Sequence, residues 1–257
     1  MEYKDLTLAL DHDWMPDEVL PVAAHFYLAP KYHPDKGMTL GSETGTSLTL
    51  PSAYAAFRKT TRLHEVPLAK LFLRATTILD IAKQENEAIR ETDLKQAMDK
   101  TRFPRGNALL LRTGWGDRGF QKEGGSRYLL ASPYLSVEAG ALLASLMAEQ
   151  ESDLLLMDSA LIGRPDKYLI PEWGALFPRP GPWPSPEAQV YLHLYTSEKA
   201  KEDFAVELIL ARAGIMTVKR LVDCAGLETG GLRIIVSPLH IVRGVSSTCR
   251  VIAVQDS

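Results

Sequence analysis

Short apolar runs alternate along the chain with segments of helical periodicity. Six runs that are rich in Val, Ile, Leu, Thr or Tyr have the length of buried strands. They span residues 76–81, 108–112, 154–157, 189–195, 215–218 and 232–236. The C-terminal part, 232–254, has the pattern of strands around a turn at 244–247. Strands that alternate with helices predict a layered α/β fold.

Three segments have the signatures of helices: 92–99, 136–149 and 197–213. Thr92 is the expected N-cap of the first, with an acidic residue in the first turn. Ser136 is the expected N-cap of the second, whose apolar residues follow a helical spacing. Gly214 follows the third segment at the position where glycine ends many helices.

The composition is that of an ordinary globular protein. The chain has 257 residues, of which 46% are hydrophobic, and a net charge of −3. We expect one domain, 1–257, with an N-terminal arm (about 1–41) and a surface loop at 177–186, where five of ten residues are proline. The charge balance gives no reason to expect nucleic acid as a partner, and no apolar run is long enough for a membrane span.

The start of the chain and the cysteines indicate a cytoplasmic protein. Residues 1–20 contain several acidic residues and no basic start, so we expect no signal peptide. Cys224 and Cys249 are too few to form a metal cluster on their own, and buried free thiols suit a reducing compartment.

Several stretches resemble, in order, the cyclase family that includes bacterial kynurenine formamidases and isatin hydrolases. Gly45-Thr46 followed by Pro51 resembles that family's motif His-x-Gly-Thr-His-x-Asp-x-Pro-x-His. Further matching stretches are 66–68 with 76–81, 106–116, 132–136, 157–159, 208–215 with Leu221, and 238–253. The resemblance implies a layered β/β/α swivelling domain and a homo-oligomer, dimer or tetramer.

The metal ligands of this family are absent. The resemblance implies a site with one or two metal ions, usually zinc or manganese, where a metal-activated water attacks an amide or lactam carbonyl. The positions that hold the family's ligands and general base fall here on Glu43, Ser47, Thr49, Ala53, Glu207 and Lys219. Two carboxylates beside an ammonium, with hydroxyls and a methyl group, do not make a hydrolytic zinc site. We therefore expect neither a metal nor another cofactor.

The replacements suggest a different pocket. If the family's backbone is kept, Glu43, Glu207 and Lys219 point into the volume that the metal would fill, and the ammonium offsets part of the charge of the carboxylates. Two interpretations stay open. The three residues are the catalytic acid/base groups of a metal-free active site, or they form a structural salt bridge in an inactive one.

The predicted function is an enzyme that acts on a small carbonyl compound, such as an amide, lactam, lactone or polyketide-like substrate. Acid/base groups can serve a hydrolase, a cyclase or a lyase. Predicted substrate contacts are Ser47, Thr49, Tyr54, Trp115 and His25. The alternative is a catalytically silent family member that binds a small ligand or partners an active homologue.

Overall fold

The structure is a computed structural model of the 257-residue chain. It describes residues 1–8, 31–33, 37–39, 44–54, 61–118, 128, 131–163 and 205–255, with the backbone alone for 31–33 and 37–39. Several sequence predictions lie outside these residues: the loop at 177–186, the strand at 189–195, most of the N-terminal arm, Glu43 and His25.

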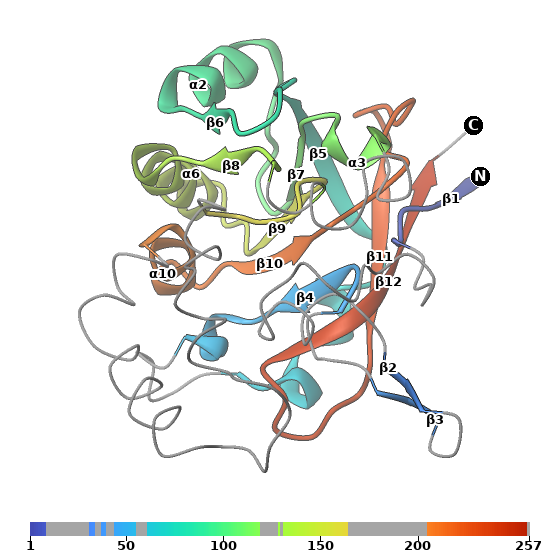
Figure 1. Cartoon of the computed structure of the whole chain (residues 1–257). Helices are drawn as coiled ribbons and strands as arrows, with labels where there is room; N and C mark the ends of the chain where they lie inside the picture. The colour runs from blue at the N-terminus through green and yellow to red at the C-terminus, as the bar shows by residue number, and fades with distance from the viewer. Residues whose placement is uncertain are drawn as a thin grey trace, which may run out of the picture.

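Eight strands form one mixed sheet in the order β1-β12-β11-β5-β7-β9-β10-β4 (Figure 1). Their bounds are β1 Glu2–Asp5, β4 Ser47–Thr49, β5 Arg74–Asp80, β7 Ala108–Arg112, β9 Leu154–Met157, β10 Met216–Lys219, β11 Arg233–Pro238 and β12 Ser246–Gln255. The four central strands, β5, β7, β9 and β10, are parallel, and the others pair antiparallel. Residues 246–248 of β12 pair with β4 and residues 249–254 pair with β11, so this strand joins both ends of the sheet.

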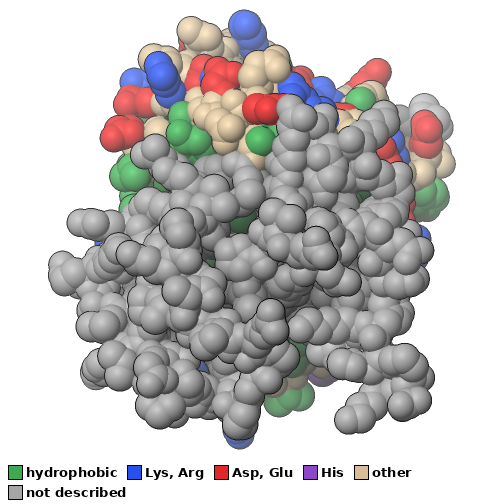
Figure 2. Space-filling model, in the orientation of Figure 1, with side chains coloured by type: hydrophobic (Ala, Val, Ile, Leu, Met, Phe, Trp, Pro, Cys, Tyr) green, Lys and Arg blue, Asp and Glu red, His purple; other side chains and the backbone are tan. Residues whose placement is uncertain are grey.

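Helices cover one face of the parallel strands. The helices are α2 Glu91–Lys100, α3 Trp115–Arg118, α6 Val137–Glu149 and α10 Ala205–Arg212. Figure 1 shows α2, α6 and α10 stacked along one side of the parallel strands. Alternate residues such as Leu155 and Met157 pack against Leu143 of α6 and Leu210 of α10 in one buried cluster. Acidic and basic side chains mix over the end of the molecule that carries α2 (Figure 2).

The other face of the parallel strands packs against β11 and β12. Leu110 and Leu156 point to this side and lie in a second cluster with Ile234 and Val251. A layer of helices, a layer of parallel strands and a layer of antiparallel strands follow one another, which confirms the predicted β/β/α architecture. Three short 3-10 helices, η2 Pro51–Ala53, η3 Leu63–Glu65 and η4 Leu68–Lys70, connect β4 to β5. Two small sheets, β2 Lys31–His33 with β3 Gly37–Thr39 and β6 Ala88–Ile89 with β8 Tyr134–Leu135, complete the described elements.

Local sequence signals predicted where most of the described helices and strands begin and end. Ser136 caps α6, since its Oγ accepts a hydrogen bond from Ala139 N at 3.2 Å. Gly214 follows α10 with φ of 77°, a conformation that favours glycine. The prediction for Thr92 was wrong, because α2 begins at Glu91 and its N-cap is Arg90, two residues before Thr92. The Asp93 carboxylate accepts a hydrogen bond from Arg90 N at 2.7 Å, which places Thr92 inside the first turn.

Both cysteines are buried and free, as expected. Burial raises the pKa of the Cys224 thiol well above its usual value and that of Cys249 to about 12. Neither thiol is therefore a reactive thiolate at neutral pH. None of the described helices is long and apolar enough to cross a lipid bilayer.

Candidate functional site

A row of polar side chains follows one face of the sheet where β10, β4 and β12 meet. Directly opposed residues of antiparallel strands point to the same face. In the strand register, Thr49 of β4 pairs with Thr217 of β10 and with Ser246 of β12. Ser47 of β4 pairs in the same way with Lys219 and with Thr248. The side chains between them, such as Leu48 and Val218, belong to the apolar cluster on the opposite face.

The polar row lies on the face that the helices cover. Thr217 pairs with Leu155 of β9, and Leu155 packs with Leu210 of α10. Ser47 is completely buried and Lys219 is 8% exposed. Lys219 is also the last residue of β10, so it lies at the carboxyl edge of the parallel strands, where α/β folds commonly bind ligands.

Glu207 approaches the same edge from α10. A connection of three residues separates α10 from β10, so the helix runs back along the strand and its first turn lies near the end of the strand. The Glu207 carboxylate is 5% exposed, and its Oε1 accepts a hydrogen bond from Gly163 N at 3.1 Å. Gly163 lies in the segment after β9. A Cβ atom at Gly163 would lie 2.9 Å from Glu207 Oε2, so glycine permits this close approach.

Sequence reasoning missed Arg220, which follows Lys219. The Arg220 side chain is 1% exposed. Its Nε donates to the Gly45 carbonyl oxygen at 2.7 Å and its Nη2 donates to Ser47 Oγ at 3.1 Å. Its backbone accepts from Thr46 Oγ1 at 2.7 Å and donates to the Ser159 carbonyl at 3.0 Å. The residue thus ties the segment before β4 to the segment after β9.

The conformation of Arg220 explains why sequence periodicity did not reveal it. Its φ is 63°, in the left-handed region, so it leaves the alternation of β10. Its place beside Lys219 was the one available signal in the sequence.

Asp158, another residue that the sequence analysis passed over, holds the neighbouring loop in place. It follows β9 and is fully buried. Its carboxylate accepts hydrogen bonds from Thr113 Oγ1 at 2.6 Å, from Thr113 N and from Gly114 N. These donors lower its pKa, but burial is the larger effect and raises the pKa to about 6.

The structure describes the surroundings of two more of the predicted substrate contacts, Trp115 and Tyr54. The Trp115 indole is completely buried, donates from Nε1 to the Tyr128 carbonyl at 2.8 Å and stacks on the Tyr128 ring. Arg118 lies over its ring at 5.1 Å. These contacts favour a packing role for Trp115. Tyr54 follows η2 and is half-buried. Binding of substrate by these residues stays a prediction.

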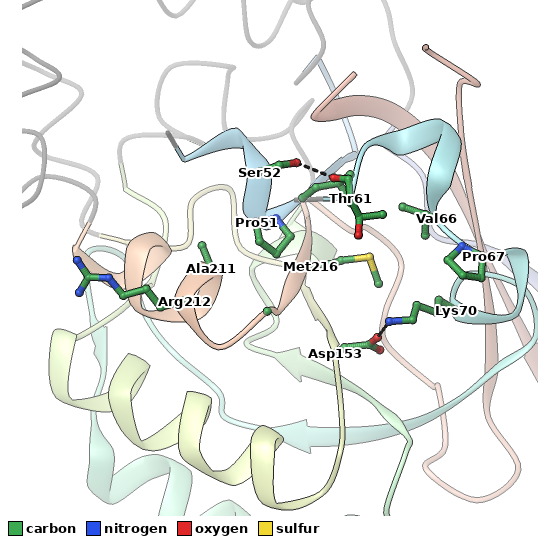
Figure 3. Close-up of a pocket in the computed structure, with 12 residues that line it drawn as sticks. Pro51, Ser52, Thr61, Val66, Pro67, Lys70, Asp153, Ala211, Arg212 and Met216 are labelled. Carbon is green, nitrogen blue, oxygen red and sulfur yellow. Dashed lines mark hydrogen bonds and ion pairs between the residues drawn. The ribbon is translucent and has the colours of Figure 1, made fainter. Parts of the chain in front are cut away.

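A cavity of about 280 Å³ lies at the other ends of β4 and β10 (Figure 3). Its wall includes Leu50, Pro51 and Met216. Lys70 and Asp153 line one side, where Lys70 Nζ and Asp153 Oδ2 form an ion pair at 2.5 Å. Leu50 and Met216 belong to the apolar cluster on the opposite face from the polar row. The cavity is therefore separate from Ser47, Lys219 and Glu207.

A family model described as putative cyclase matches residues 4–161. The chain belongs to this family. A search of curated protein sequences finds no match.

Solved structures of cyclase-family proteins share the fold. Isatin hydrolase A from Labrenzia aggregata, bound to benzyl benzoate, is 19% identical with a TM-score of 0.67, and the alignment covers 100% of this chain and 94% of that one. An isatin hydrolase bound to the product analogue thioisatinate is 14% identical with a TM-score of 0.68 and coverage of 99% and 93%. A potential metal-dependent hydrolase with cyclase activity is 15% identical with a TM-score of 0.65 and coverage of 100% and 98%.

In the part of the chain that the structure describes, the side chains at the family's ligand positions do not fit its metal. At the ligand positions that the structure describes, Ser47 accepts a hydrogen bond from a guanidinium and Lys219 brings an ammonium. Ala53 has no donor atom at all. Among the described residues, no group of three or more His, Cys, Asp and Glu side chains could hold a metal ion. Glu207 supplies one carboxylate, but hydroxyls, a methyl group and an ammonium at the other described positions do not complete the set of imidazole and carboxylate ligands that zinc or manganese prefers.

Proposed function

We propose that this cyclase-family protein is a hydrolase or cyclase that acts on a small carbonyl compound without a metal. The observation that carries the proposal is the placement of buried Glu207, Lys219 and Ser47 on the helix-covered face, at the carboxyl edge of the parallel strands. A buried carboxylate and a buried ammonium supply a proton acceptor and a proton donor.

The proposed chemistry assigns the proton transfers to Glu207 and the stabilisation of charge to Lys219. In hydrolysis, the Glu207 carboxylate takes a proton as water adds to the carbonyl carbon. Lys219 stabilises the negative charge that develops on the carbonyl oxygen. The bond to the leaving nitrogen or oxygen then breaks, and the proton held by Glu207 passes to the leaving atom. In a cyclisation the substrate's own nucleophile replaces the water.

The substrate class is an amide, lactam or lactone. Structural relatives include isatin hydrolases, and isatin contains a lactam. Hydrolysis of this bond needs one attacking water and one protonated leaving group, which the proposed pair supplies. Glu43, which lies outside the described residues, is proposed as a second carboxylate of the same site.

Turnover and metal content test this proposal together. Purified protein is assayed on formamides, lactams and lactones over a range of pH, with and without a chelator, and its metal content is measured. We expect turnover that a chelator leaves unchanged and less than 0.1 metal ions per chain, as an order of magnitude for an empty site. About one zinc or manganese per chain, removed together with activity by the chelator, would contradict the proposal. Complete inactivity on the panel would favour a silent, ligand-binding family member.

We also propose that the chain forms a homo-oligomer, a dimer or tetramer. The support is the resemblance to the cyclase family. Light scattering across a dilution series decides this, because a constant mass of 28.4 kDa, the mass of one chain, would contradict it.

A further inference from the structure

We propose that the cavity of about 280 Å³ beside η2 is a second binding site, which takes a small carboxylate with an apolar body. It lies at the start of β10, where Met216 is the first residue, whereas Lys219 of the proposed catalytic site is the last residue of the same strand. The inference does not depend on the proposed function, because the two sites share no described residue. Three features of the cavity support it: its size, the division of its wall and the charge of its polar side.

The cavity is formed by segments that are far apart in the chain. Pro51 belongs to η2, Lys70 to η4 and Ala211 to the last turn of α10, while Asp153 precedes β9. The volume corresponds to about nine water molecules at about 30 Å³ each, near the lower end of the range for small-molecule pockets. The cavity therefore has room for a ligand on the order of ten non-hydrogen atoms.

Apolar side chains form one part of the wall. Leu50 and Met216 are buried members of the core cluster between the two layers of strands. Pro51, Val66 and Ala211 extend this surface around the cavity. Figure 3 shows the Pro51 ring and the Met216 side chain in the middle of the lining residues. An apolar group that replaces water on such a surface binds favourably, so this part of the wall favours a ligand with an apolar body.

The polar side of the cavity carries more positive than negative charge. Lys70 Nζ and Arg74 Nη2 both donate to the Asp153 carboxylate, at 2.5 Å and 3.0 Å, so one negative charge is shared by two positive ones. Lys70 and Asp153 line the cavity directly (Figure 3). Arg212 also lines it, and its guanidinium, which points away from Met216 in Figure 3, adds a further positive charge nearby. The charge of these described residues favours an anionic ligand over a neutral one.

The same cluster has more hydrogen-bond donors than acceptors. Each oxygen of the Asp153 carboxylate accepts one bond, Oδ2 from Lys70 and Oδ1 from Arg74. The Lys70 ammonium has three donors, and this contact uses one of them. Arg74 Nε is buried and has no hydrogen-bond partner in the described part of the chain. A carboxylate in the cavity would give Lys70 a second acceptor and give the two cations a second negative charge.

The test compares ligands that differ in one property. Binding of 3-phenylpropionate, of its neutral analogue 3-phenylpropanamide and of acetate to the intact protein is measured by calorimetry. We expect 3-phenylpropionate to bind at least about fivefold more tightly than the amide, which lacks the charge, and than acetate, which lacks the apolar body. Equal affinities for 3-phenylpropionate and the amide would overturn the inference, as would equal affinities for 3-phenylpropionate and acetate.

Two variants change the charge of the cavity in opposite directions. Lys70→Met removes the ammonium and should reduce the preference for the carboxylate over the amide by at least about threefold. Asp153→Asn keeps the size of the side chain and removes the competing negative charge, so it should raise this preference by at least about threefold. Such a gain is a result that damage to the fold would not produce.

Lys95→Met is the matched control. Lys95 lies on α2, is 61% exposed and pairs with Glu91, so this variant removes the same charge and one surface ion pair outside the cavity. We expect it to leave the preference unchanged. A preference that stays at the wild-type value in both cavity variants, or that falls equally in Lys95→Met, would overturn the inference.

A further variant separates the cavity from the proposed catalytic site. Lys219→Met removes a cation from that site, and we expect 3-phenylpropionate to bind it as it binds the wild type. Binding that is lost in Lys219→Met and kept in Lys70→Met would place the carboxylate in the catalytic site and overturn the inference. The comparison of Lys70→Met with Lys95→Met provides the test if Lys219→Met or Asp153→Asn does not fold.

Binding and turnover fail separately. Binding of 3-phenylpropionate that depends on Lys70, in a protein that turns over no substrate, would support this inference and count against the proposed function. Turnover by a protein that does not bind 3-phenylpropionate would have the opposite meaning.

Discussion

Replacing Gly163 with alanine tests how the Glu207 carboxylate is positioned. The new Cβ atom would lie 2.9 Å from Oε2 and 3.1 Å from Oε1 of Glu207. Carbon–oxygen contacts are normally about 3.4 Å or longer, so the carboxylate must move by about half an ångström or more. Because its hydrogen bond to Gly163 N is already 3.1 Å long, this movement breaks the bond.

The expected loss of stability follows from that one hydrogen bond between Gly163 N and the Glu207 carboxylate. A hydrogen bond to a charged group contributes about 1.5–3 kcal/mol. For a chain of this size, a loss of 1 kcal/mol lowers the melting temperature by about 2–4 °C, so that of Gly163→Ala should fall by roughly 3–12 °C. If Glu207 transfers protons in the reaction, a displacement of this size lowers kcat by about 10- to 100-fold.

The assay measures the melting temperature and kcat of three glycine variants side by side. Gly230→Ala is the neutral control, since a Cβ atom there would meet nothing within 4 Å. Gly140→Ala would bring a Cβ atom to 2.9 Å from Val206 Cγ1, between α6 and α10, and should lower stability while kcat changes less than threefold. Wild-type kcat and melting temperature in Gly163→Ala would refute the role of this contact in holding Glu207.

Three further predictions concern Asp158, Ser136 and Lys219. Burial raises the pKa of Asp158 from 3.8 to about 6, so the fold favours the protonated form of this carboxyl group. The free energy of unfolding should therefore fall by about 3 kcal/mol as the pH rises from about 4 to about 6. Denaturation of Asp158→Asn over this pH range should lack that loss, and an identical pH dependence would contradict it. Ser136→Ala removes the N-cap of α6 and should lower the free energy of unfolding by about 1 kcal/mol. An unchanged denaturation midpoint would show that the cap does not contribute to stability. Lys219→Met should reduce kcat at least tenfold and shift the pH profile of turnover, and full activity would remove Lys219 from the proposed chemistry.

Much of the fold could be predicted from local sequence. The segment 108–112 is a strand with these bounds, and 76–81 and 215–218 are within two residues of β5 and β10. These strands are buried on both faces, so they are continuous apolar runs that sequence reveals directly. The start of α2 was missed because the side chain of Asp93, inside the helix, supplies the capping interaction that was expected from Thr92.

The candidate site was predicted only in part. Ser47, Glu207 and Lys219 came from the resemblance to the family, and the structure places all three on buried positions of one face or its edge. Their convergence with Glu43 stays a prediction, since Glu43 lies outside the described residues. Trp115 was also expected to contact substrate, because a strand end commonly borders a pocket. Its indole is buried and stacks on Tyr128, and a contact with substrate stays a prediction.

The sequence by itself determined the family and the order of strands and helices, because each of these depends on residues that are close together in the chain. It also predicted the loss of the metal ligands. Only the tertiary structure decided which cation contacts Ser47. Pairing of β4 with β10 joins segments about 170 residues apart, and the left-handed backbone at residue 220 turns Arg220 toward Gly45 and Ser47. No periodicity within the sequence carries that information, because the contact depends on a long-range strand register and on one unusual backbone angle.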